Sequence, residues 1–246
     1  MGDMEKVRDL IEEADAVCVL TGAGISAESG IPTFRGKDGL WRKKDPTRLA
    51  SIDAFMANPE EVWEFYHWRR RLISKVTYNR GHSALVELER KKQDFTLITQ
   101  NVDGLHSEAG SRNLIEIHGN IWWVRCIECG ERYEERDLEL PPLPRCGHCG
   151  GLLRPDVVFF GESLNRELLD RCYQALTSCE VMLVIGTSSN VQPAASFSLV
   201  AKEAGASLVE INLEPTPYSR YMDYNLFGKA GDILPMLVAE NIKEDN

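Results

Sequence analysis

Short apolar runs alternate with longer amphipathic stretches along most of this chain. The apolar runs predict buried strands at residues 14–20, 95–99, 114–118, 156–160, 181–185 and 208–212. The spacing of apolar residues predicts helices at residues 3–14, 52–75, 81–92, 165–177, 193–204 and 232–240. Strands that alternate with helices favour an α/β fold, a doubly wound parallel sheet with right-handed crossovers.

Two stretches interrupt this alternation. Residues 37–92 are mostly helical and too long for a simple crossover, and residues 119–155 contain four closely spaced cysteines. We interpret both as insertions that together form a smaller domain. Residues 1–36, 93–118 and 156–246 would then form a Rossmann-like domain, with the ligand cleft between the smaller domain and the carboxyl edge of the sheet.

Composition narrows the class of protein. The chain has 246 residues, 43% of them hydrophobic and 27% charged, which is typical of a soluble globular protein. Its formal charge of −10 argues against general binding to nucleic acid. The chain has no apolar run long enough to span a membrane, and its charged N-terminus does not resemble a signal peptide. We expect a cytoplasmic monomer.

The cysteines predict a metal site. Cys126, Cys129, Cys146 and Cys149 form the pattern C-x2-C-x16-C-x2-C, in which each pair offers two thiolates to one tetrahedral Zn²⁺. Four protein ligands would close this site, so the zinc ribbon is expected to be structural. His148 lies within the second pair and could compete as a ligand, but we interpret it as a turn residue.

A glycine-rich turn follows the first strand. Gly22, Gly24 and Ala27 fit G-x-G-x-x-G/A, in which glycines let the backbone approach a pyrophosphate. The alternative is a tight turn that binds no ligand. Ordinary dinucleotide folds place an acidic residue about 20 residues later, at the end of a second strand. This chain has no such strand there, so a ribose would have to be held in another way.

Three further groups could carry chemistry. Residues 100–106 follow a strand end, where their amide and carboxylate groups could face the cleft or cap a helix. His118 ends another strand and suits a general base, although a lone histidine there is more often structural. Tyr66 and Arg69 share one helical face and could clamp a carboxylate; the alternative is an ordinary solvated face.

Taken together, these motifs resemble the sirtuin family of NAD-dependent protein-lysine deacylases, over about residues 14–235. The residues that carry the resemblance are the run from Thr21 to Gly36, the heptad Q-N-V-D-G-L-H at 100–106, H-G-N at 118–120 and the cysteine pairs. The resemblance implies that His118 is the catalytic base. It also implies that NAD is contacted by Gly22, Ala23, Gly24, Ile25, Thr33, Phe34, Arg35, Trp41, Gln100, Asn101, Val102, Asp103, Gly186, Thr187, Ser188, Asn212, Leu213, Glu214 and Ala230.

The same resemblance implies the substrate, an acyl-lysine protein or peptide. Its contacts would be Ala50, Tyr66, Arg69, Val157, Phe159, Gly161 and Glu162. Thr33 and the pair Tyr66 and Arg69 resemble the subgroup that removes succinyl, malonyl and other acidic acyl groups as well as acetyl. NAD would be consumed, giving nicotinamide and O-acyl-ADP-ribose. Val102, Asn190 and Gln192 depart from the common family motifs.

Other functions remain open on this sequence. A plain deacetylase would lack the acidic-acyl preference, and a mono-ADP-ribosyltransferase could use the same scaffold. A non-enzymatic NAD-binding or zinc-ribbon interaction module is disfavoured by His118 in its expected context. A hydride-transfer dehydrogenase is disfavoured by the missing acidic residue.

Overall fold

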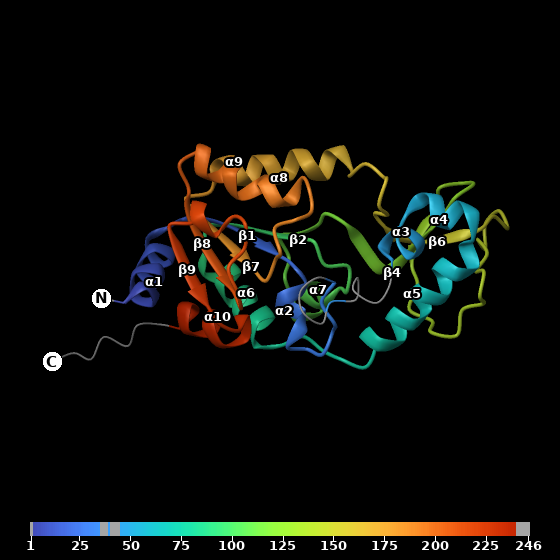
Figure 1. The fold of residues 1–246 in the computed structure, drawn as a ribbon, viewed down its shortest axis with the longest axis horizontal. Helices are drawn as coiled ribbons and strands as arrows, with labels where there is room; N and C mark the ends of the chain where they lie inside the picture. Colours follow the sequence, from blue (N-terminus) through green and yellow to red (C-terminus); the bar gives the residue numbers. More distant parts are fainter. Residues whose placement is uncertain (1, 35–38, 40–44, 240–246) are drawn as a thin grey trace.

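The computed structural model describes residues 2–34, 39 and 45–239. The molecule is elongated and has two parts (Figure 1). The sheet module contains the parallel sheet and both ends of the described chain. The smaller module, formed by residues 45–73 and 119–157, lies at the opposite end (Figure 1).

The sheet module is built on six parallel strands. Their order across the sheet is β3-β2-β1-β7-β8-β9. The strands are β1 (Ala16–Thr21), β2 (Asp94–Thr99), β3 (Leu114–Glu116), β7 (Val181–Ile185), β8 (Ser207–Asn212) and β9 (Tyr224–Phe227). Successive strands run outward in opposite directions from β1 and β7. The prediction of a doubly wound sheet is therefore confirmed, and its switch point lies between these two strands.

Helices cover both faces of this sheet because successive residues of its strands point to opposite sides. Val17 and Val19 pack into the core on one side, and Cys18 and Leu20 pack into the core on the other. The first core is covered by α1 (Asp3–Glu13), α6 (Arg80–Lys91) and α10 (Ala230–Val238). The second is covered by α8 (Arg166–Ser178), η2 (Ala194–Ser196) and α9 (Phe197–Glu203). Helices α8 and α9 lie above the sheet in Figure 1.

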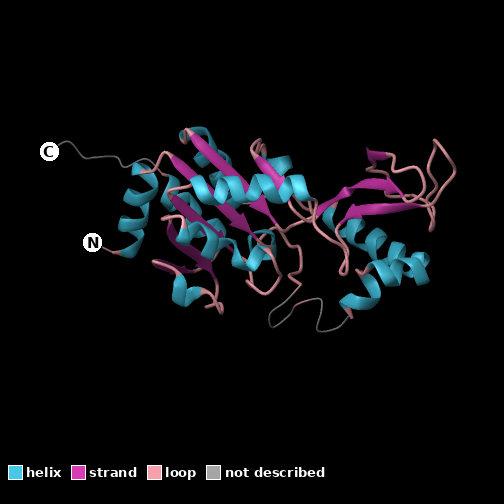
Figure 2. Cartoon of the chain, turned by 90° about the horizontal axis from the view of Figure 1, so that it is seen from above, coloured by secondary structure: helices cyan, strands magenta, loops and turns pink. Residues whose placement is uncertain are grey.

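The smaller module packs helices against a three-stranded antiparallel sheet of order β5-β4-β6 (Figure 2). Its core includes Phe55, Trp63 and Phe159, all nearly inaccessible. Its elements are α3 (Pro46–Leu49), α4 (Ile52–Ala57), α5 (Pro59–Ile73), β4 (Gly119–Cys126), β5 (Arg132–Glu134) and β6 (Leu153–Val157). Three short helices complete the fold: α2 (Ala23–Ala27), α7 (Leu105–Ala109) and η3 (Ser219–Tyr221).

Two predicted elements are wrong. Residues 156–160 were expected to rejoin the parallel sheet, but the strand there is β6, which pairs antiparallel with β4. An apolar run predicts a buried strand without identifying its partner. The single helix predicted at 52–75 is two helices, because Asn58 has φ −148° and ψ 77°. Its Oδ1 accepts from the backbone of Glu61, so Asn58 ends α4 and caps α5.

Helix α6 also differs from its expected place. Residues 81–92 were assigned to the smaller domain, but Ala84, Leu85 and Leu88 pack in the core of the parallel sheet with α10. The edge strand β9 was not predicted, because it has only four residues and only Leu226 among them is buried, which gives little strand signal.

Candidate active site

A cleft of about 1240 Å³ lies at the switch point, between the sheet module and the smaller module. Both insertions and both halves of the sheet contribute to it. Its lining includes residues 22–24, 33–34, 50, 66, 69, 100–102, 118, 157–164, 186–188, 211–217 and 228–230. Most residues predicted to bind NAD or substrate therefore line one cavity, although they lie far apart in the sequence.

The floor of the cleft is formed by two glycine loops in direct contact. One contains Gly22 and Gly24 after β1, and the other contains Gly186 after β7. The backbone N–H of Gly24 donates to the carbonyl of Gly186 at 2.8 Å. A Cβ on Gly24 would lie 2.6 Å from the Gly186 Cα, and Gly186 itself has φ +58°. Only glycines allow this approach, which leaves backbone surface open to a ligand. The turn after β1 and the turn after β7 thus form one continuous surface.

Amide side chains join the strand ends above this floor. Asn101 Nδ2 donates to the Gly22 carbonyl at 3.1 Å and to Ser26 Oγ at 3.2 Å. Gln100 Nε2 donates to Thr187 Oγ1 at 2.9 Å, across from β2 to β7. These bonds hold the residues 100–103 turn against both glycine loops.

Asp103 lies behind the cleft wall and is not among the lining residues. Its carboxylate accepts from Ser26 Oγ at 2.8 Å and from the Leu105 backbone at 3.0 Å. Burial raises the pKa of Asp103, and these two hydrogen bonds oppose that effect. Its position supports a role in holding the turn of residues 100–103, which we call the Asn101 turn. Ile25 is likewise fully buried and outside the lining.

His118 lines the cleft two residues after the end of β3, and its tautomer follows from one contact. Nδ1 lies 3.1 Å from the carbonyl oxygen of Gln100, which can only accept, so Nδ1 carries a proton. In the neutral ring Nε2 then holds the lone pair. Burial lowers the pKa of His118, although the bond to Gln100 opposes it. The ring is therefore neutral at pH 7 and can accept a proton at Nε2.

Gly119 is required beside this histidine. It has φ +80°, and a Cβ there would lie 2.2 Å from the Asp156 carbonyl oxygen. The close approach lets β4 pair with β6 immediately after His118, with Gly119 opposite Val157. The backbone of His118 also accepts from Val158 at 2.9 Å. The sheet module and the smaller module therefore meet at the histidine.

Tyr66 and Arg69 both reach the cleft from α5. Their exposed fractions are 3% and 6%, and the Arg69 guanidinium lies 4.6 Å from the centre of the Phe34 ring. Burial raises the pKa of Tyr66 to about 12, so its hydroxyl remains a donor at neutral pH. Among the described residues, no carboxylate forms an ion pair with Arg69. The wall thus offers a phenol and a cation to a ligand.

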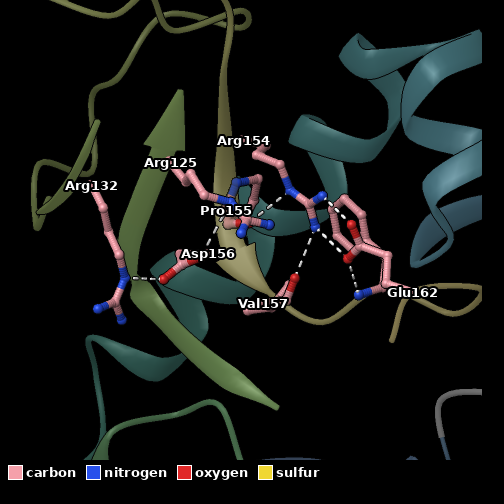
Figure 3. Close-up of polar contacts among 8 residues, drawn as sticks. Arg125, Arg132, Arg154, Pro155, Asp156, Val157 and Glu162 are labelled. Atoms are coloured by element: carbon pink, nitrogen blue, oxygen red, sulfur yellow. Dashed lines mark hydrogen bonds and ion pairs between the residues drawn. The ribbon is translucent and has the colours of Figure 1, made fainter. Parts of the chain in front are cut away.

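Glu162 was predicted to contact substrate, and its carboxylate is engaged by Arg154 (Figure 3). Arg154 Nη1 donates to Glu162 Oε1 at 2.5 Å, and Arg154 Nη2 donates to Glu162 Oε2 at 2.8 Å. The backbone N–H of Phe159 also donates to Glu162 Oε2, at 2.8 Å. Burial alone would raise the pKa of Glu162, but these bonds outweigh it and lower the pKa. The Arg154 guanidinium also lies 4.0 Å from the Phe159 ring centre. The pair therefore fixes the wall that Phe159 forms.

Sequence reasoning missed Arg154. An arginine between apolar residues of a strand, eight positions before an acidic residue, was the available signal. The neighbouring Asp156 lies between Arg125 and Arg132 on the β4 and β5 strands (Figure 3). Two residues predicted to bind NAD, Arg35 and Trp41, lie outside the described residues.

The four predicted cysteines meet at one point of the smaller module. The Sγ atoms of Cys126 and Cys149 are 3.5 Å apart, those of Cys129 and Cys146 are 3.8 Å apart, and all four lie within 4.8 Å. A Zn²⁺ with thiolate bonds of about 2.3 Å needs sulfurs about 3.8 Å apart. The cysteines therefore fit one zinc ion. None of them lines the cleft, and His148 is exposed.

The fold and the cleft define an α/β protein with a Rossmann-like sheet, a ligand cleft at the switch point and a four-cysteine metal module. Residues 22–193 match the Sir2 family, and the chain belongs to this family. It is 54% identical over 215 residues to an NAD-dependent protein deacylase of Aquifex aeolicus (strain VF5), an alignment covering 87% of this chain and 90% of that protein.

Solved structures agree with this assignment. A Sir2 homolog in complex with NAD has a TM-score of 0.90 and 48% identity, covering 95% of this chain and 92% of that one. A Sir2 protein with a deacetylated p53 peptide and 3′-O-acetyl ADP-ribose has a TM-score of 0.87 and 34% identity, with coverage of 95% and 96%.

Proposed function

We propose that this protein is an NAD-dependent protein-lysine deacylase. It transfers the acyl group of a modified lysine to ADP-ribose and releases nicotinamide. The relatives named as deacylases and the neighbour with an acetylated ADP-ribose support this reaction. The observation that carries it is a neutral histidine, His118, in the same cleft as the paired glycine loops.

Residue roles follow from position in the cleft. Bound NAD would supply the ribose carbon that the acyl oxygen attacks as nicotinamide leaves. The Gly22–Gly24 and Gly186 loops would lie against the diphosphate, and Gln100 and Asn101 would orient the nicotinamide half. Asn212 and Glu214, at the end of β8, would hold the adenosine half near Ala230. His118 Nε2 would take a proton from a ribose hydroxyl.

The test of this function is turnover of an acyl-lysine peptide with NAD, followed by mass spectrometry of all products. We expect the deacylated peptide, nicotinamide and O-acyl-ADP-ribose in equal amounts. His118→Ala should lower kcat by about 10²- to 10⁴-fold, the usual contribution of a positioned base, while NAD still binds in calorimetry. Wild-type turnover in the variant would remove His118 from the mechanism. ADP-ribose attached to an acceptor protein would instead indicate a transferase.

We infer further that the acyl pocket accepts acidic acyl groups. Arg69 and Tyr66 lie buried on the cleft wall, where a guanidinium and a phenol could bind the distal carboxylate of a succinyl or malonyl group. Low exposure strengthens such a bond because little water competes with it. Ala50, also on the lining, leaves room for the longer acyl chain.

Two peptides that differ only in acetyl- or succinyl-lysine test this preference. Arg69→Met keeps an unbranched apolar stem and removes the guanidinium with its charge. We expect it to lower kcat/KM for the succinyl peptide by at least tenfold, since a buried charge-assisted bond is worth about 1.5–3 kcal/mol. Acetyl turnover should change little. Equal loss on both peptides would contradict the clamp and leave a plain deacetylase.

We also propose how the protein exists in the cell. Zinc binding by four cysteines requires reduced thiols, and all seven cysteines are free, which favours the cytoplasm. Among the described residues, no helix is long and apolar enough to cross a membrane.

The charge of −10 favours basic, lysine-bearing peptides over nucleic acid as partners. A monomer is expected, and light scattering after gel filtration measures this directly.

A further inference from the structure

A chain of hydrogen bonds starts at Glu116, two residues before His118. Asn120 Nδ2 donates to Glu116 Oε1 at 2.7 Å, and Asn120 Oδ1 accepts from the Trp122 backbone at 2.9 Å. Because the carbonyl end of the Asn120 amide is fixed by an N–H donor, its NH₂ group must face Glu116. Asn120 is 5% exposed, so few waters can replace either partner. The three residues thus clamp the loop that carries His118.

The same chain continues to the glycine loops. The indole N–H of Trp122 donates to the Asp103 carbonyl at 2.9 Å, and the Asp103 carboxylate accepts from Ser26 Oγ. Ser26 in turn accepts from Asn101 Nδ2, which also donates to the Gly22 carbonyl. A second link joins the backbones of Ile121 and Val102 at 2.8 Å. The chain therefore connects two walls of the cleft, the His118 loop and the Asn101 turn.

Glu116 itself lies outside the cleft lining and is partly buried. Burial raises the pKa of Glu116 to about 7, and the hydrogen bond from Asn120 opposes this effect. Two charged groups face it from neighbouring elements: Asp103, before α7, further raises the pKa, and Arg132, on β5, lowers it. Its carboxyl group can therefore change charge in the range where the protein works.

We propose that Glu116 is a positioning residue, whose ionised carboxylate holds Asn120 and, through Trp122 and Asp103, aligns the His118 loop with the nicotinamide half of the cleft. This role rests on the proposed deacylase function. An ionised carboxylate accepts a stronger hydrogen bond than a protonated one. When Glu116 gains a proton, the Asn120 clamp weakens and His118 is held less well relative to the Asn101 turn.

The ratio of wild-type to Glu116→Gln kcat/KM, measured from pH 6 to pH 8, tests this role. Glutamine keeps an acceptor oxygen but never ionises, and the ratio cancels the titration of His118, which both proteins share. We expect a ratio of about tenfold at pH 8, typical of slight misplacement of a catalytic group. It should fall to about twofold at pH 6, where most wild-type Glu116 is protonated. Glu203→Gln, an exposed charge removal on α9, should give a ratio near one throughout.

Two further measurements separate positioning from general damage. In an Asn120→Ala background, Glu116→Gln should add no further loss, because the clamp is already broken. In a ¹⁵N spectrum, the Trp122 indole N–H, assigned by Trp122→Phe, should shift with a midpoint near pH 7 in the wild type and remain constant in Glu116→Gln. This signal needs no turnover, so it tests the clamp even if the protein proves not to be a deacylase.

A kcat/KM ratio that is constant with pH would overturn the proposal. Additive losses in the Asn120→Ala, Glu116→Gln double variant would also overturn it, as would a Trp122 indole titration that is the same in wild type and Glu116→Gln. Circular dichroism and zinc content should match the wild type in every variant. If Glu116→Gln fails to fold, the indole titration of the wild type alone still decides, because a flat signal there contradicts an ionising clamp.

Discussion

Burial sets the chemistry of the key side chains at the scale of single residues. It keeps the Tyr66 phenol protonated and leaves the His118 ring neutral, with its lone pair on Nε2. For Arg154 and Glu162, burial acts together with pairing: the bidentate contact holds both charges and lowers the pKa of Glu162. Such pairs add little stability themselves, but removing one partner leaves the other unpaired.

Arg154→Met should therefore destabilise the protein by about 3 kcal/mol, the lower end for a broken buried pair because Glu162 keeps some access to water. Phe159 also loses its cation–π contact, so acyl-peptide affinity should fall as well. Urea unfolding measures the first effect. Arg154→Met combined with Glu162→Gln should recover part of the loss, whereas equal stability of Arg154→Met and wild type would contradict a structural role for the pair.

At the scale of elements, the two turns after β1 and β7 decide where a ligand can lie. Their backbones touch through Gly22, Gly24 and Gly186, and the Asn101 side chain ties the turn after β2 to them. The buried strands could be predicted from the sequence, because a parallel strand has apolar residues on both faces and therefore forms an unbroken apolar run. The pairing of the turns depends on the strand order, which no local pattern contains.

Gly24→Ala tests this contact. The added Cβ would lie 2.6–2.7 Å from Gly186 backbone atoms, which cannot move as a flexible side chain could. We expect a loss of stability of about 1–3 kcal/mol, as for other overpacked sites, and weaker NAD binding. Urea unfolding and calorimetry measure the two effects. Gly147→Ala, where the added Cβ has no neighbour within 4 Å, is the matched control. Equal behaviour of both variants would argue against the close packing.

At the scale of the whole molecule, α6 joins the sheet module to the active-site region through a buried histidine pair. The rings of His82 and His106 have centroids 4.8 Å apart, and His106 Nε2 lies 2.9 Å from Thr21 Oγ1 at the end of β1. The backbone N–H of Asn79 donates to His82 Nδ1. Protonating His82 would remove this acceptor and bury a charge. Burial accordingly lowers the pKa of His82 to about 4.

The stability of the protein should therefore depend on pH through His82. In the unfolded chain this histidine protonates below about pH 6.5, whereas in the folded protein it stays neutral to about pH 4. The contribution of His82 to the free energy of unfolding is complete above pH 6.5. About 3 kcal/mol of it is lost as the pH falls from 6.5 to 4. Urea unfolding at several pH values should show a shallower acid loss in His82→Asn than in wild type. Parallel curves would contradict a buried neutral His82.

By itself, the sequence determined the local features of this protein: the buried strands, the glycine turn, the cysteine pairs and the residue types needed for the chemistry. These follow from periodicity and short-range spacing, which are properties of neighbouring residues. Only the tertiary structure decided that β6 pairs with β4, that α6 packs on the sheet, and that Glu162 is held by Arg154. Those outcomes depend on which buried surfaces and charges, far apart in sequence, complement one another once the chain is packed.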